Sequence, residues 1–140
     1  MTENDSRATP FYGHSEVSAQ ERGRMRIPNW ALKQLVTRDV ESVWISPLPG
    51  NPALVVYPPQ PWHQWAEQMR EKLRTREERL TPRQFMALSM QRTWEERQRI
   101  FIPLRVWRHA QIIPPDSAIL MGTGERFELW ARRNEEQALG

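Results

Sequence analysis

A nine-residue segment that occurs twice constrains the fold of this chain more than any other feature. Residues 20–28 align with residues 95–103, 75 positions later, and five of the nine positions are identical. Each copy is followed by an amphipathic stretch and then by two short apolar segments. Self-similarity at a fixed spacing is typical of duplicated architectures, and the shared order of these features makes chance a poor explanation. The sequence therefore predicts two diverged copies of one unit.

Each copy predicts a strand, a tight turn, a second strand, a short helix and two further strands. Gly23 supplies the turn after Arg22, because glycine adopts positive φ at no steric cost. Pro28 ends the second strand and suits the first turn of a helix. We expect these helices at 29–35 and 104–110, and apolar strands at 42–45, 53–57, 118–121 and 126–130. Residues 122–124 form the turn between the last two strands.

A helical spacer is expected between the copies. Apolar side chains at a spacing of three and four, including Trp62, Trp65 and Leu73, predict a helix over 59–74. Thr81, followed by Pro82 and by Gln84, is a typical helix start. The tryptophans at such positions are better explained by core packing than by stacking on bases. Residues 1–10 and 132–140 are expected to be flexible tails.

The size of the repeat predicts how the copies are arranged. A unit of about 50 residues with very short strands is difficult to stabilise alone. We therefore expect one unit over 11–74 and a second over 75–131, interleaved into one pseudo-symmetric core. The expected fold class is α+β and β-rich, with helices covering the strands.

Composition excludes several classes of function. The chain has no cysteine and three isolated histidines, His14, His63 and His109, without the spacing of metal ligands. No activated nucleophile or phosphate-binding loop is present either, so we expect no catalytic residue, metal or cofactor. No apolar run approaches the roughly 18 residues that span a bilayer, and the polar, acidic start is unlike a secretory signal. The expected location is the cytoplasm.

Positive charge is concentrated in two islands. Residues 20–38 hold five basic side chains and one acidic one, and residues 70–108 hold eleven basic and five acidic ones. Residues 39–69 contain no lysine or arginine. Two basic islands could form a surface for phosphate groups. For residues 70–83, the alternative of a merely solvated helix surface stays open.

The repeated segments resemble the MraZ family. The opening motif of that family is similar to Phe11-Tyr12-Gly13, Glu16-Val17-Ser18, Gln20-Glu21-Arg22-Gly23-Arg24 and Ile27-Pro28. Its second motif is similar to Glu95-Glu96-Arg97-Gln98-Arg99 with Ile102-Pro103, and its closing hairpin to residues 119–122 and 126–130. The resemblance covers about residues 11–131 in the right order.

This resemblance implies a fold and a function. The fold would be two interleaved swapped-hairpin units of the AbrB type in a pseudo-two-fold barrel. The chain would be a bacterial, cytoplasmic and nucleoid-associated transcriptional regulator that assembles into a homo-oligomeric ring. Its partner would be double-stranded promoter DNA with short direct repeats, in the division and cell-wall gene cluster that includes its own promoter.

The resemblance also implies which residues meet DNA. The family signature is an Asp followed, four positions later, by an Arg, with a basic residue two positions before that Arg. By this pattern the candidate DNA-binding residues are Arg22, Arg24, Arg97 and Arg99, to which strand alternation adds Arg26. Gln20 and Glu95 stand at the Asp positions and, together with Gly23, would orient the arginines. A two-stranded ribbon can enter the major groove, where a guanidinium matches guanine or phosphate.

Alternatives to DNA reading remain at this stage. The same arginines could instead form surface ion pairs with Glu21, Glu95 or Glu96, each worth about 0–1 kcal/mol. The chain could be an AbrB-type antitoxin that neutralises a partner with its tail. It could also be a structural ring that has lost affinity for DNA.

Overall fold

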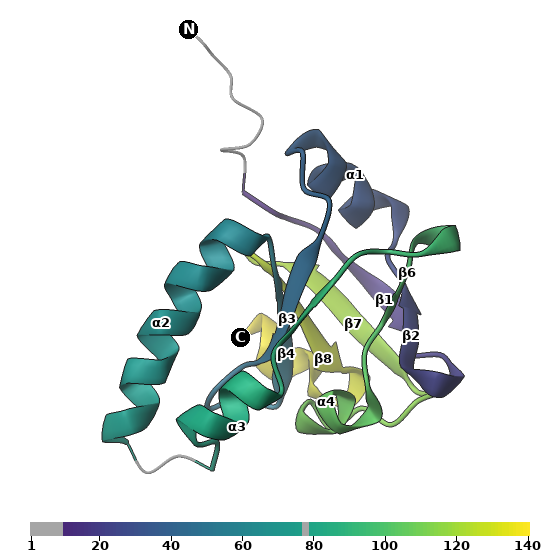
Figure 1. Ribbon diagram of the computed structural model, residues 1–140. Helices are drawn as coiled ribbons and strands as arrows, with labels where there is room; N and C mark the ends of the chain where they lie inside the picture. Colours follow the sequence, from purple (N-terminus) through teal and green to yellow (C-terminus); the bar gives the residue numbers. More distant parts are fainter. Residues whose placement is uncertain (1–9, 77–78) are drawn as a thin grey trace, which may run out of the picture.

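The computed structural model describes residues 10–76 and 79–140 and has an α+β fold (Figure 1). Six antiparallel strands form one sheet in the order β1-β7-β8-β4-β3-β5, and two strands, β2 and β6, form a separate ribbon. The strands of the sheet are β1 (His14–Ser18), β3 (Val43–Pro47), β4 (Ala53–Tyr57), β5 (Met90–Arg92), β7 (Ser117–Gly122) and β8 (Phe127–Ala131). The expected α+β class is confirmed.

The elements of the two halves recur at the spacing of the sequence repeat. The 3-10 turns η2 (Glu21–Gly23) and η3 (Glu96–Gln98) lie 75 positions apart, as do β2 (Arg24–Arg26) and β6 (Arg99–Phe101). The helices α1 (Asn29–Thr37) and α4 (Leu104–His109) also begin 75 positions apart. The duplicated sequence therefore folds twice into the same succession of elements.

Strands of the two halves pair with each other. β2 pairs with β6, and β4 pairs with β8 in the middle of the larger sheet. The backbone N–H of Ile102 donates to the carbonyl oxygen of Gly23 at 3.1 Å, and the N–H of Ile27 donates to that of Gln98 at 2.8 Å. These reciprocal bonds relate the copies by an approximate two-fold axis. Among the described strands, β1 and β5 end the larger sheet without pairing to each other, so the sheet does not close into a barrel.

The two faces of the large sheet pack against different partners. Alternate strand residues such as Ile45, Leu54 and Leu120 join one buried cluster with the ribbon, α1 and α4. Their neighbours in sequence, such as Val55 and Ile119, join a second cluster with α2 (Pro59–Thr75) and α3 (Pro82–Ala87). The ribbon and α2 therefore lie on opposite sides of the sheet, as Figure 1 shows at right and left.

The spacer helices begin and end close to the expected positions. Trp62 and Leu73 face the second cluster, and the indole rings of Trp62 and Trp44 stack with centroids 3.7 Å apart. At the start of α3, the Thr81 hydroxyl accepts from the Gln84 backbone N–H while the Gln84 side chain accepts from the Thr81 N–H. This reciprocal cap confirms the predicted helix start.

The C-terminal segment is more regular than expected for a flexible tail. Residues 132–140 contain η4 (Arg132–Asn134) and α5 (Glu135–Leu139). Ala138 packs against the second cluster, and Arg133 donates to the carbonyl oxygen of Gln111 at 2.6 Å. These contacts were not evident from the polar sequence. Of the other expected tail, residues 1–9 lie outside the described residues.

Candidate nucleic-acid interface

The ribbon presents charged side chains on one face and apolar side chains on the other. In the antiparallel pair, Met25 lies opposite Ile100, and these two side chains are 1% and 0% exposed. Successive side chains of a strand leave by opposite faces. The cross-strand pairs on either side, Arg24 with Phe101 and Arg26 with Arg99, therefore share the outward face.

The turns before the two strands break the alternation that the sequence suggested. Arg22 and Gly23 have φ of 70° and 83°, and Arg97 and Gln98 have φ of 61° and 62°. Because Arg22 lies in this left-handed turn, which the sequence placed at Gly23, it lies outside the strand that carries Arg24 and Arg26. The side chain of Arg22 is exposed at the ribbon end, like that of Arg97.

Gly23 is required by a close approach of two backbones. A Cβ atom at this position would lie 2.2 Å from the carbonyl oxygen of Ile102, far inside van der Waals contact. The Gly23 carbonyl accepts hydrogen bonds from the Ile102 N–H and from the Trp107 indole at 3.0 Å. The turn that carries Arg22 is therefore fastened to the second copy.

Glu95 contacts an arginine of the other copy. Its Oε1 lies 3.3 Å from Nε of Arg24, with both side chains partly exposed. Thus a residue at a motif position of copy two contacts the arginine of copy one across the pseudo-two-fold axis. Within the described part of the chain, the Gln20 side chain makes no equivalent hydrogen bond to Arg99, whose Nε donates to the Glu96 carbonyl at 3.4 Å.

Arg26 and Arg99 form a like-charge pair at the other end of the ribbon. Their Cα atoms are directly opposite in the register, and like charges in this position are destabilising. No carboxylate among residues 10–76 and 79–140 forms an ion pair with either guanidinium. Arg26 is exposed and Arg99 is half-buried. An anion placed over the ribbon would relieve this repulsion.

The two turns enclose an open groove of about 590 Å³. It brings together five of the eight sequence-predicted site residues, and Arg26, Arg97 and Gly23 lie outside its lining. The groove is lined by Gln20, Glu21, Arg22, Arg24, Glu95, Glu96 and Arg99. The charges of three arginines and three glutamates balance in this lining, and Arg26 and Arg97 add positive charge outside it.

The described residues contain no cluster of three or more His, Asp or Glu side chains that could hold a metal ion. The guanidinium groups that line the groove can donate hydrogen bonds to planar or tetrahedral oxyanions.

Curated proteins similar to this chain share one name. No protein-family model matches the chain. The "Transcriptional regulator MraZ" of Bacteroides fragilis is 27% identical over 130 residues, covering 91% of this chain and 80% of that protein. Proteins of the same name from Bacteroides thetaiotaomicron (28% over 129 residues, 91% and 81%) and Pseudomonas aeruginosa (27% over 121 residues, 86% and 79%) are also similar. The chain is therefore similar to MraZ proteins over most of its length.

The chain departs from the signature expected from its resemblance to MraZ proteins at three positions. Gln20 and Glu95 replace the Asp, and Gln98 replaces a Gly at a position with positive φ. The Gln98 amide donates to the Ile27 carbonyl at 2.7 Å and to Asn29 Oδ1 at 3.0 Å. These bonds compensate for the strained backbone of the second turn.

The contacts of Phe101 and Arg92 in the ribbon region were not evident from the sequence. Phe101 replaces an arginine at the position equivalent to Arg26, and its ring centroid lies 5.6 Å from Cζ of Arg24 and 5.8 Å from Cζ of Arg92. Arg92, on β5, donates to the Phe101 carbonyl at 3.0 Å. The alternation of residues 99–101 could have placed Phe101 on the outer face, but no local signal connects it to Arg92.

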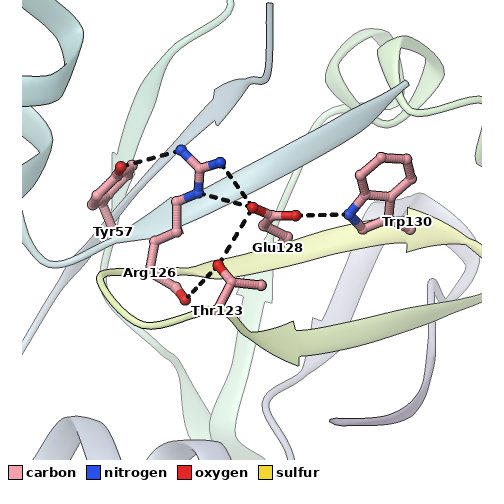
Figure 2. Close-up of polar contacts among 5 residues, drawn as sticks. All are labelled: Tyr57, Thr123, Arg126, Glu128 and Trp130. Carbon is pink, nitrogen blue, oxygen red and sulfur yellow. Dashed lines mark hydrogen bonds and ion pairs between the residues drawn. The ribbon is translucent and has the colours of Figure 1, made fainter. Parts of the chain in front are cut away.

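The hairpin of β7 and β8 contains a largely buried ion pair (Figure 2). Arg126 Nη2 lies 2.8 Å from Oε2 of Glu128, and Nη1 donates to the hydroxyl of Tyr57 at 3.2 Å. The Trp130 indole donates to Oε1 of Glu128 at 2.9 Å, and the Thr123 hydroxyl to Oε2 at 3.3 Å. The network connects β4 with the β7–β8 hairpin and stabilises the sheet that supports the ribbon.

Burial and hydrogen bonding shift two pKa values in this network. Burial alone would lower the pKa of Arg126, but the hydrogen bonds to Glu128 and Tyr57 outweigh it and raise the pKa. Burial raises the pKa of Tyr57, while its hydrogen bond with Arg126 acts in the opposite direction. Arg126 is therefore a fixed cation, and Tyr57 stays protonated at neutral pH.

In the described part of the chain no helix is both long and apolar enough to cross a bilayer.

Proposed function

We propose that this chain is a transcriptional regulator that binds promoter DNA in a sequence-specific way. The outward ribbon is the reading element, and Arg22, Arg24, Arg26, Arg97 and Arg99 are its DNA-binding residues. Gln20, Gly23 and Glu95 position them. The name of the related proteins supports regulation of transcription.

One observation carries this proposal. The outer face of the ribbon places Arg26 directly opposite Arg99, and neither is neutralised by a carboxylate of the described residues. A ribbon selected only for stability would avoid such a pair. DNA phosphates, or the O6 and N7 acceptors of a guanine, would convert the repulsion into favourable contacts.

The similarity to MraZ proteins supports the finer parts of the proposal. We place the two units at 11–74 and 75–131, with the ribbon strands exchanged between them in the swapped-hairpin manner of the AbrB type. A single ribbon holds few free cations. A homo-oligomeric ring would present the same ribbon many times to short direct repeats and would raise the effective concentration of each successive contact.

The target DNA is the promoter of the chain's own gene within a bacterial division and cell-wall gene cluster. This assignment rests on the resemblance to MraZ proteins and places the protein in the cytoplasm at the nucleoid. No step of this function uses a cofactor or a catalytic residue.

A mobility-shift titration tests the proposal. The full chain should bind the DNA directly upstream of its own gene more tightly than an unrelated fragment of equal length. Arg24→Ala should weaken specific binding by about 1–3 kcal/mol if this guanidinium reads a base. Equal binding to both fragments at every salt concentration would exclude sequence-specific recognition.

A further inference from the structure

The outer face of the ribbon is chemically asymmetric. Its two strands are related by the repeat, yet Phe101 occupies the position equivalent to Arg26. One end of the ribbon therefore presents two guanidinium groups, those of Arg26 and Arg99. The other end presents the guanidinium of Arg24 beside the phenyl ring of Phe101.

Phe101 does not serve the protein interior. Among the described hydrophobic side chains, it belongs to neither buried cluster and to neither set of side chains packed against them. The inward positions of the ribbon are already filled by Met25 and Ile100. The phenyl ring is half-buried, and the guanidinium carbons of Arg24 and Arg92 lie 5.6 Å and 5.8 Å from its centroid.

A base edge offers a matching group for such a ring. The C5 methyl of thymine is an apolar group in the major groove, and aromatic side chains make apolar contacts with it. Phosphates and the guanine edge present oxygen and nitrogen acceptors, which gain nothing from a phenyl ring. On the basis of the function proposed above, we propose that Phe101 reads a thymine methyl while Arg26 and Arg99 contact guanine or phosphate.

The spacing of residues along the ribbon predicts where the thymine lies relative to the other contacts in the DNA site. Residues two apart on a strand lie about 6.6 Å from each other, which is about two base-pair steps of 3.4 Å. If the ribbon follows the groove, the thymine lies about two base pairs from the contact of Arg26 and Arg99. Because the two ends read different groups, the ribbon binds its site in one direction only. A fully two-fold ribbon would bind equally in both.

DNA without thymine methyl groups tests the inference directly. The upstream fragment is amplified once with dTTP and once with dUTP, in the second case with primers that contain deoxyuridine in place of thymidine. This removes every such methyl group and leaves the hydrogen-bonding groups of each base pair unchanged. Burial of one methyl group corresponds to about a fourfold change in affinity, so the full chain should bind the dUTP fragment at least about fourfold more weakly.

Two variants assign the effect to the residue. Phe101→Ser should bind the thymine fragment more weakly and lose the preference for it, while Phe101→Leu should retain part of the preference. Circular dichroism confirms that each variant is folded. A wild-type chain that binds both fragments equally would overturn the thymine contact and leave the proposed function intact. A preference that persists in folded Phe101→Ser would assign the methyl contact to another residue and overturn the inference. Failure of the wild-type chain to bind either fragment would overturn both proposals.

Discussion

Glu95 of the second copy holds Arg24 of the first copy, with Oε1 3.3 Å from Nε. This contact joins two residues 71 positions apart and crosses the pseudo-two-fold axis. A carboxylate in the groove has two opposing effects on DNA binding. It repels phosphate, and it fixes the orientation of a guanidinium that would otherwise be mobile.

We therefore predict that Glu95→Gln separates affinity from specificity. Binding to unrelated DNA should become several-fold tighter at low salt because a negative charge is removed. The ratio of affinities for the upstream DNA and for unrelated DNA should fall because Arg24 is held less firmly. Glu96→Gln is the matched control, since it removes the same charge from the same groove and should leave that ratio unchanged. A similar loss of the ratio in both variants would contradict a positioning role for Glu95.

Gly23→Ala should destabilise the fold through its contact with Ile102. Gly23 and Gly50 both have φ of 83°, but an added Cβ meets the Ile102 carbonyl at 2.2 Å in the first case and nothing within 4 Å in the second. Gly50→Ala should cost about 1 kcal/mol of unfolding free energy from backbone strain alone. Gly23→Ala should cost clearly more and weaken DNA binding as well. Urea denaturation of the two variants measures the difference in unfolding free energy. Equal losses of unfolding free energy would show that the backbone near Gly23 shifts to accommodate the added Cβ atom.

Glu128→Gln should lower the unfolding free energy more than most other single substitutions in the chain. It leaves the largely buried guanidinium of Arg126 without its counter-charge. Breaking a fully buried pair costs about 3–5 kcal/mol, and the loss here should lie near the lower end of that range because the Arg126 side chain is 19% exposed. Glu16→Gln is the control, because the pair of Glu16 with Arg132 is 3.1 Å long but largely exposed. That substitution should change the unfolding free energy by less than about 1 kcal/mol. Thermal or urea unfolding gives both values, and similar losses would contradict the importance of burial.

Stability should fall in alkaline solution because of Tyr57. Burial raises the pKa of this phenol above its ordinary value of 10.0, so the folded state favours the protonated form. The stabilisation is complete below pH 10 and is lost as the pH rises through the folded-state pKa. Tyr57→Phe should flatten this part of the profile of unfolding free energy against pH. An unchanged alkaline slope in Tyr57→Phe would assign the effect to other groups.

The sequence predicted local elements well where each is encoded by neighbouring residues. The repeat, the turn at Gly23, the capping box at Thr81 and the β4 strand at 53–57 all follow from spacing and turn chemistry. The pairing of β2 with β6 and of β4 with β8 could be expected only in general, as interleaving. No local sequence pattern predicts which strands pair with each other, because the register depends on contacts between segments that are distant in sequence.

The site was less predictable than the fold. Arg24 and Arg26 lie on the outer face as expected, whereas the left-handed turn removes Arg22 from their strand. Glu95 was expected to orient the arginines, but its partner across the two copies, Arg24, could be given only as one of several possible ion pairs. The Arg126–Glu128 ion pair was not predicted, because residues 126–130 were interpreted as an apolar strand. Sequence alone does not reveal which charged side chains are buried together.

The most direct measurement compares two double variants in a titration against the upstream DNA. Arg26→Ala with Arg99→Ala removes the like-charge pair of the ribbon, and Arg70→Ala with Arg74→Ala removes the same charge from α2 on the opposite side of the sheet. The ribbon variant should lose at least about tenfold in specific affinity without losing stability, because the repulsion is removed as well. The α2 variant should bind nearly as tightly as the wild-type chain. Equal loss in the two variants, or full binding by the ribbon variant, would contradict the account.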